Sequence, residues 1–287
     1  MCWRVCVSST RRGGMSEKKS KLKPNAEGKK RSDGGPSELP CVVMIPGTLC
    51  DERIFHRQKH ALRGIANVKI VGYRDLGRNV DWVAALLAQL PQRFCLVGFS
   101  LGGLWALELL RRAPERIERL AMVASNALGA GVTIQRKTSR LWRLWRVLGP
   151  GAVAQRVKPE YFHHEMQRRR YARMVHDMAL STDSKVAHAE FNWAASRPDG
   201  HADLARFPGP LLIVSGAKDR LCTPAMQRSM VMTQPNAQWV ELPRVGHFVP
   251  LEASPRLSDA LRQWISLQTK SFNDDDSRRT APAIHSL

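Results

Sequence analysis

Apolar residues follow two alternating patterns between residues 41 and 125. Short apolar runs are typical of strands buried on both faces, and apolar residues three or four positions apart are typical of one helix face. The runs predict strands at 41–45, 67–73, 94–97 and 117–125. The periodic segments predict helices at 51–62, 80–90 and 104–110. This alternation predicts an α/β fold, in which a parallel sheet is covered by helices on both faces.

The alternation stops between about residues 131 and 205, where helical periodicity continues without a convincing strand. Leu141, Leu144, Trp145 and Leu148 share one helix face in this stretch. Two further apolar runs, at 211–216 and 238–242, predict strands after it. We therefore expect a helical insertion with its apolar face on the core and its arginines in water. Arg197-Pro198-Asp199 indicates a turn, a salt bridge that anchors the insertion, or a substrate contact.

The passage Gly98-Phe99-Ser100-Leu101-Gly102-Gly103 lies between a predicted strand and a predicted helix. A serine flanked by glycines at such a junction is the nucleophile-elbow pattern. The turn is too tight for side chains at positions 98 and 102. It directs the serine hydroxyl into open space. The next helix begins immediately, so its free N–H groups face any negative charge that forms at the site. Ser100 is therefore the candidate nucleophile.

In folds with this elbow, an acid and then a histidine follow the serine along the chain, and this sequence has a candidate for each. Asp219 follows the predicted strand 211–216, and His247 follows the predicted strand 238–242. Each lies after a strand end, where α/β folds bind their ligands. A serine hydroxyl is a weak nucleophile until a base takes its proton and an acid orients that base. We expect His247 to be the base and Asp219 the acid.

These motifs resemble the α/β-hydrolase superfamily over residues 41 to 268. The matching passages are Ile45-Pro46-Gly47-Thr48, Gly98 to Gly103, Gly216 to Asp219 and Gly246 to Glu252. The chain looks most like small carboxylesterases and acyl hydrolases, such as those that cleave pimeloyl-carrier-protein methyl ester. The resemblance implies an oxyanion hole made by the backbone N–H groups of Thr48 and Leu101. Many relatives have His-Gly where this chain has Pro46-Gly47, but a backbone donor does not require that histidine side chain.

The resemblance also implies that the insertion at about 131–205 is a lid over the catalytic pocket. The implied reaction is hydrolysis of a carboxylic ester through an acyl-enzyme, with no metal and no organic cofactor. A thioesterase or acyltransferase acting on a carrier-protein- or CoA-linked acyl group is one alternative. A non-catalytic protein that binds an acyl ligand in a hydrolase fold is another.

Charge adds a possible partner to this picture. The 287-residue chain has a formal net charge of +20, of which the first 39 residues carry +6 and residues 269–287 none, so the middle carries +14. Such a surface is either simply solvated or attracts an acidic partner. An acidic acyl-carrier protein, the phosphates of coenzyme A and an anionic membrane are the candidates. We expect no nucleic-acid partner, because no binding motif accompanies the basic residues. The sequence leaves the oligomeric state open.

The same reasoning divides the chain into three parts. We expect disordered tails at residues 1–39 and 269–287 and the hydrolase domain at residues 40–268. Met15 is a second plausible start of the chain. No apolar stretch approaches the roughly 20 residues that cross a bilayer, so we expect no membrane-spanning segment, and we favour a membrane surface less than the other candidate partners. The six cysteines lack metal-ligand spacing. We therefore expect a reduced, cytoplasmic protein.

Overall fold

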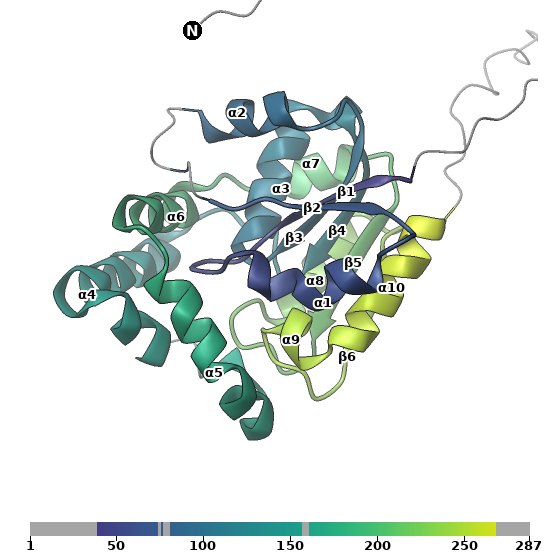
Figure 1. Cartoon of the computed structure of the whole chain (residues 1–287). Helices are drawn as coiled ribbons and strands as arrows, with labels where there is room; N and C mark the ends of the chain where they lie inside the picture. The colour runs from purple at the N-terminus through teal and green to yellow at the C-terminus, as the bar shows by residue number, and fades with distance from the viewer. Residues whose placement is uncertain (1–38, 74–75, 77–80, 157–160, 268–287) are drawn as a thin grey trace, which may run out of the picture. The chain divides into compact units, whose positions relative to one another are not determined.

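The computed structural model describes residues 39–73, 76, 81–156 and 161–267 (Figure 1). The tails predicted at 1–39 and 269–287 lie outside these residues, apart from Leu39. Six strands form one parallel sheet in the order β2-β1-β3-β4-β5-β6. The strands are β1 (Cys41–Ile45), β2 (Asn67–Ile70), β3 (Phe94–Phe99), β4 (Ile117–Val123), β5 (Leu211–Gly216) and β6 (Gln238–Leu242). The predicted α/β class and all six predicted strands are confirmed.

Two strands end earlier than predicted. β2 ends at Ile70 because its neighbour β1 is followed by Pro46, which has no N–H to continue the ladder. β4 ends at Val123 because Ala124 takes a left-handed backbone conformation, with φ of +43°. Both endings turn the chain into loops at the carboxyl edge of the sheet.

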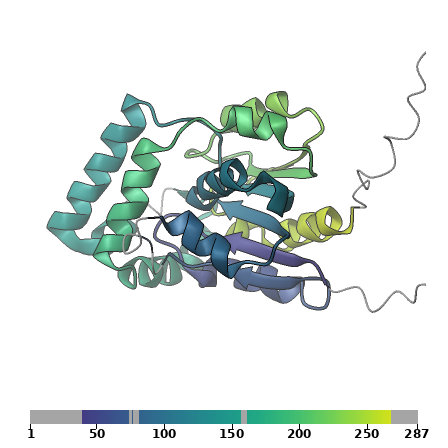
Figure 2. The same cartoon turned by 90° about the horizontal axis from the view of Figure 1, so that it is seen from above.

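Helices cover both faces of the sheet (Figures 1 and 2). One face packs on the turn η1 and on α1 and α10, where Phe55 and Trp264 are fully buried. The other face packs on α2, α3, α7 and α8. The helices are η1 (Glu52–Phe55), α1 (His56–Ala61), α2 (Trp82–Gln89), α3 (Leu101–Arg112), η2 (Pro114–Arg116), α7 (His201–Arg206), α8 (Pro224–Thr233), α9 (Val249–Glu252) and α10 (Ser254–Ser266). Burying one large apolar side chain stabilises such layers by about 1.5–3 kcal/mol.

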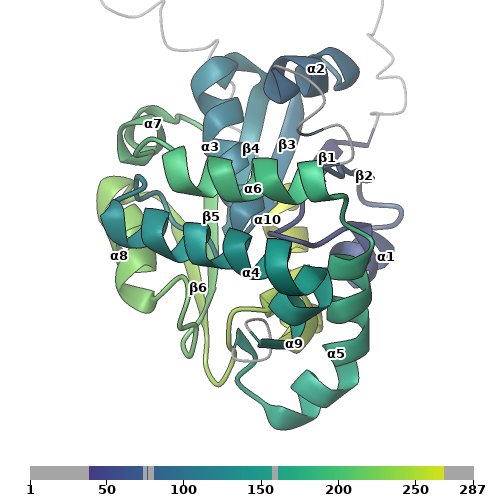
Figure 3. The same cartoon turned by 90° about the vertical axis from the view of Figure 1, so that its left-hand side faces the viewer.

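The predicted helical insertion lies between β4 and β5. It contains α4 (Val132–Arg156), α5 (Glu165–Leu180) and α6 (Ser184–Ser196), and Figure 3 shows α4 and α6 side by side across one end of the sheet. Stacked indole rings of Trp105 on α3 and Trp193 on α6, 4.3 Å apart, attach the insertion to the core. The fourth helix of the predicted stretch, α7, packs instead on α3 and α8 beside the sheet.

One detail of the predicted apolar face is wrong. Trp145 is buried, but Leu148 is 49% exposed. The helix is interrupted next to it, at Gly149, whose φ of +79° is followed by Pro150. Leu148 itself keeps a helical position, so its side chain stays on the predicted face, but that face is no longer covered in the last turn before the interruption. In the described ranges, no helix has both the length and the apolar composition that crossing a bilayer requires.

Candidate active site

The chain turns sharply at Ser100, between β3 and α3. The Ser100 backbone has φ of +54° and ψ of −116°, a conformation that L-residues rarely adopt. A Cβ atom on Gly98 would lie 2.5 Å from the carbonyl oxygen of Gly102, and a Cβ on Gly102 would lie 2.5 Å from that of Pro46. Both glycines are therefore required by space. The Ser100 N–H donates to the Val123 carbonyl at 3.0 Å, so the strained turn is fixed to the neighbouring strand.

The structure brings the three predicted side chains together. The distance between Ser100 Oγ and His247 Nε2 is 2.9 Å, and that between His247 Nδ1 and Asp219 Oδ2 is 2.8 Å. Both Asp219 and His247 are 3% exposed. A carboxylate only accepts hydrogen bonds, so Nδ1 carries the ring proton and Nε2 is the acceptor for the serine hydroxyl. The arrangement can take a proton from Ser100 onto His247.

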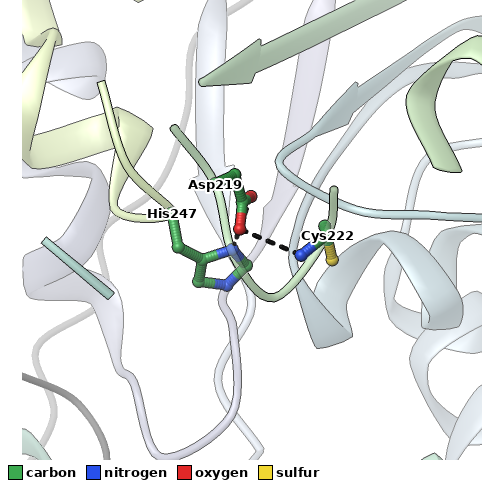
Figure 4. Close-up of side chains that lie close together, drawn as sticks. All are labelled: Asp219, Cys222 and His247. Carbon is green, nitrogen blue, oxygen red and sulfur yellow. Dashed lines mark hydrogen bonds and ion pairs between the residues drawn. The ribbon is translucent and has the colours of Figure 1, made fainter. Parts of the chain in front are cut away.

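Backbone groups hold the acid in place. The Asp219 Oδ1 atom accepts the N–H groups of Leu221 at 2.8 Å and Cys222 at 2.9 Å. Its other oxygen is left for His247, as Figure 4 shows for the carboxylate between the imidazole and the Cys222 backbone. The carboxylate therefore has one orientation, and that orientation sets the plane of the imidazole.

Glu252 holds the histidine loop, although sequence reasoning did not predict its contacts. Its carboxylate, at the end of α9, accepts the N–H groups of Gly246 at 3.2 Å, Phe248 at 3.2 Å and His163 at 2.9 Å. The His247 N–H donates to the Tyr161 carbonyl at 2.8 Å. These bonds connect the histidine loop to the segment that precedes α5.

The two predicted oxyanion donors come from the loop after β1 and from the first residue of α3. Thr48 follows β1, Leu101 begins α3, and both line the same cavity as His247. The strand order reverses between β1 and β3, and ligands of α/β sheets bind at such a reversal, beyond the carboxyl ends of the strands. This topology therefore places Thr48 and Leu101 at the same end of the sheet as Ser100.

A buried glutamate on the insertion contacts the loop that contains Thr48. Leu49 has a left-handed backbone, with φ of +52°, and its N–H donates to Glu190 Oε2 on α6 at 2.7 Å. Glu190 is 1% exposed. On the other side of the loop, Tyr73 Oη donates to the Pro46 carbonyl at 2.5 Å. Burial, followed by the nearby Glu190 and Cys50, raises the pKa of Tyr73 well above its ordinary value, so this hydroxyl stays a donor.

The cavity beside these residues has a volume of about 310 Å³. Its walls come from the strand-end loops and from the insertion, and most of its lining side chains are apolar. They include Leu104 on α3, Leu141 on α4, Phe191 on α6 and Met226 on α8. Two cations, Lys137 and Arg197, also line it. A cavity of this kind fits a small, largely apolar group next to the serine.

Cys222, Asp219 and His247 form a candidate metal site, because each offers a ligand atom and these atoms lie within 4.8 Å of one another (Figure 4). The donor set does not fit that role. Burial raises the pKa of the Cys222 thiol to about 12, and a metal needs the thiolate. Nδ1 of His247 is already bonded to Asp219. The group therefore suits proton transfer, and the neutral thiol is a poor nucleophile.

Fold and site together define a class of protein, a hydrolase fold with a serine at the strand-to-helix elbow. A model described as the alpha/beta hydrolase family matches residues 42–260. The chain belongs to the alpha/beta hydrolase family.

Named relatives cover smaller parts of the chain. A 96-residue stretch is 30% identical to the biotin biosynthesis bifunctional protein BioHC of Cellvibrio japonicus, over 31% of this chain and 19% of that protein. A 45-residue stretch is 44% identical to the pimeloyl-acyl-carrier-protein methyl ester esterase of Aromatoleum aromaticum, over 16% of this chain and 18% of that protein. A thermophilic esterase from Thermogutta terrifontis has a similar structure, with TM-score 0.70 and 24% identity, over 79% of this chain and 90% of that one. The two sequence relatives are thus matched over about a fifth of their length, and the solved structure shows the shared fold.

Sequence reasoning did not identify Glu190 as part of the site, and it named Arg197 only as part of a turn, a salt bridge or a substrate contact. For the predicted salt bridge, no described carboxylate pairs with Arg197, whereas Asp199 pairs with His201, with Oδ1 and Nδ1 2.8 Å apart. A charged residue within an otherwise apolar helix face was the available signal for Glu190, which stands beside the buried Phe191. That signal does not say what the carboxylate contacts.

Proposed function

We propose that this protein is a serine hydrolase that cleaves a carboxylic ester through an acyl-enzyme. The observation that carries the proposal is the continuous hydrogen-bonded series from Ser100 through His247 to Asp219, beside a mostly apolar cavity. Esterases and other hydrolases with the same fold support it.

Each residue has a role in the proposed reaction. His247 takes the hydroxyl proton as Ser100 Oγ attacks the ester carbonyl, and the Thr48 and Leu101 N–H groups bind the oxyanion that forms. His247 then gives the proton to the leaving alcohol. Water attacks the acyl-enzyme with His247 again as base, and the acid and Ser100 are released. Asp219 holds the imidazole in the correct tautomer and stabilises its positive form.

The insertion formed by α4, α5 and α6 acts as a lid in this proposal, within a single hydrolase domain at 40–268. Side chains from α4 and α6, Leu141 and Phe191 among them, form the outer wall of the cavity. Excluding water from the site strengthens the hydrogen bonds to the developing oxyanion.

Labelling with a fluorophosphonate probe tests whether Ser100 is activated. We expect the native protein to react and tandem mass spectrometry to find the phosphonyl group on Ser100, because the probe reports a serine whose proton a base can remove. Heat-denatured protein is the control and should not react. If the native protein turned over no ester and carried no label at Ser100, the result would instead favour a non-catalytic protein that binds an acyl ligand.

A second candidate is hydrolysis of an acyl group attached to an acidic carrier protein. Four arginines on α4 are exposed and have no carboxylate partner in the described ranges: Arg136, Arg140, Arg143 and Arg146. The similarity of a short segment to a pimeloyl-carrier-protein esterase also favours this candidate. An arginine-rich surface of this kind attracts an acidic protein through long-range charge.

Salt dependence separates the two candidates. For a carrier-bound ester, we expect kcat/KM to fall about tenfold or more between low salt and about 0.5 M NaCl, because salt screens charges that attract the carrier. A small neutral ester measured in parallel should change little. Equal salt dependence for the two substrates would argue against a carrier-protein partner.

A further inference from the structure

Arg197 is a buried cation without a counter-ion among the described residues. Arg197 is 7% exposed and lies at the C-terminal end of α6. Nε donates to the Leu128 carbonyl at 2.9 Å, and Nη1 donates to the Ala194 carbonyl at 2.6 Å. Burial lowers the pKa of the guanidinium, which means that the charge is held in an unfavourable place.

The backbone contacts account for only part of this placement. Two carbonyl oxygens and the negative end of the α6 dipole offset some of the desolvation of the charge. They use Nε and Nη1, whereas Nη2 donates to no acceptor in the described part of the chain. Arg197 lines the cavity beside His247, so this remaining donor belongs to a group at the edge of the proposed substrate site.

A second cation lies near the same place. Lys137 on α4 also lines the cavity, and it is exposed, with no ion pair to any described carboxylate. Both Arg197 and Lys137 line the same cavity wall as Cys222. The neighbouring lining side chains, Leu221 and Met226, are apolar.

We propose that Arg197 and Lys137 form a carboxylate-binding subsite, so that the preferred ester substrate carries a second, anionic carboxylate. The inference rests on the proposed esterase function and specifies its substrate class. A carboxylate that entered the cavity would accept a charge-assisted hydrogen bond from Arg197 Nη2 and would be attracted by the Lys137 ammonium. It would supply the counter-charge that none of the described residues places there. The apolar lining would contact the carbon chain between this carboxylate and the ester.

A matched pair of substrates tests the subsite. Monomethyl adipate and methyl hexanoate differ only in having a carboxylate or a methyl group at the far end of the chain, and shorter and longer pairs cover the other spacings. We measure released methanol and compare kcat/KM within each pair. For the best spacing we expect the anionic ester to be preferred by about 10- to 100-fold, the range of a hydrogen bond to a charged group.

Variants assign the preference to these residues. We expect Lys137→Gln to lower the ratio of kcat/KM for the anionic ester to that for the neutral ester several-fold. We expect Arg197→Gln to abolish most of this preference. In both variants the change should be a higher KM for the anionic ester. Arg256→Gln removes the same charge from the exposed surface of α10, away from the cavity lining, and should leave the ratio unchanged, which controls for net charge. Arg197 also caps α6, so Arg197→Gln could fail to fold. In that case the test uses Arg197→Lys, which keeps a cation at this position, and Lys137→Gln, which changes an exposed residue.

The outcomes separate the subsite from the esterase itself. Turnover of neutral esters with no anionic preference at any spacing would overturn the subsite and leave the proposed function standing. A preference that persists in both the Lys137 and Arg197 variants would also overturn it. Failure to hydrolyse either member of any pair, together with no fluorophosphonate label, would overturn the proposed function.

Discussion

Replacing Ser100 with alanine is expected to lower kcat toward p-nitrophenyl butyrate by about 10⁴-fold or more. The reason is that the hydroxyl is the attacking group, and no other described hydroxyl or thiol is equivalently placed. Ser100 Oγ lies 2.9 Å from His247 Nε2, whereas the thiol of Cys222 is kept neutral by burial. Initial rates over a range of substrate concentrations give kcat and KM separately, and KM should change little.

The fold should survive this substitution, because alanine accepts the same backbone conformation and the Ser100 backbone bonds are unaffected. Far-ultraviolet circular dichroism and the thermal midpoint verify that point. Ser266→Ala, an exposed serine at the end of α10, is the matched control and should retain full activity. Comparable rates for Ser100→Ala and the native protein would refute the nucleophile assignment.

Replacing Glu190 with alanine is expected to lower kcat by about 10²-fold, the size of effect that follows loss of one oxyanion donor. Glu190 accepts the N–H of Leu49, the residue after the proposed donor Thr48. The left-handed backbone of Leu49 is strained by about 1–3 kcal/mol and persists only while surrounding contacts hold it. Without the carboxylate, we expect the loop to relax and the Thr48 N–H to move away from the oxyanion position.

Two readouts distinguish this positioning role from a merely structural one. Glu190→Gln keeps an oxygen that can accept the Leu49 N–H, so it should recover most of the kcat lost in Glu190→Ala. KM should stay nearly constant in both variants, since the effect falls on the transition state. Leaving the Leu49 N–H buried and unsatisfied should also destabilise Glu190→Ala by about 1–3 kcal/mol in urea unfolding. The exposed Glu115→Ala is the control, and a loss of stability with unchanged kcat would reject the positioning role.

The elements of the sheet could be predicted because their causes are local. A run such as Leu211 to Gly216 has no polar face to present to water, so it becomes a strand covered on both sides. The glycines at 98 and 102 report a turn in which no side chain fits, whatever surrounds it. The order of Ser100, Asp219 and His247 after three strand ends predicts that they share one edge of the sheet.

Other features could not be predicted in this way because their partners are distant. The contact between Leu49 and Glu190 spans 141 residues and joins a strand-end loop to a helix of the insertion. The contact between Glu252 and His163 depends on how the segment before α5 returns to the histidine loop. The exposure of Leu148 depends on which distant residues cover the last turn of α4 before Gly149.

By itself the amino-acid sequence determined the parallel sheet, the elbow at Ser100 and the loops that carry Asp219 and His247, since hydrophobic period and steric exclusion act between near neighbours. Tertiary structure alone decided that the Ser100 and His247 side chains meet at 2.9 Å, that Glu190 reaches the Leu49 N–H, and that Arg197 lines the cavity without a carboxylate from the described chain. Hydrogen bonds and desolvation depend on which distant groups come within a few ångströms, and only the packed layers fix those distances.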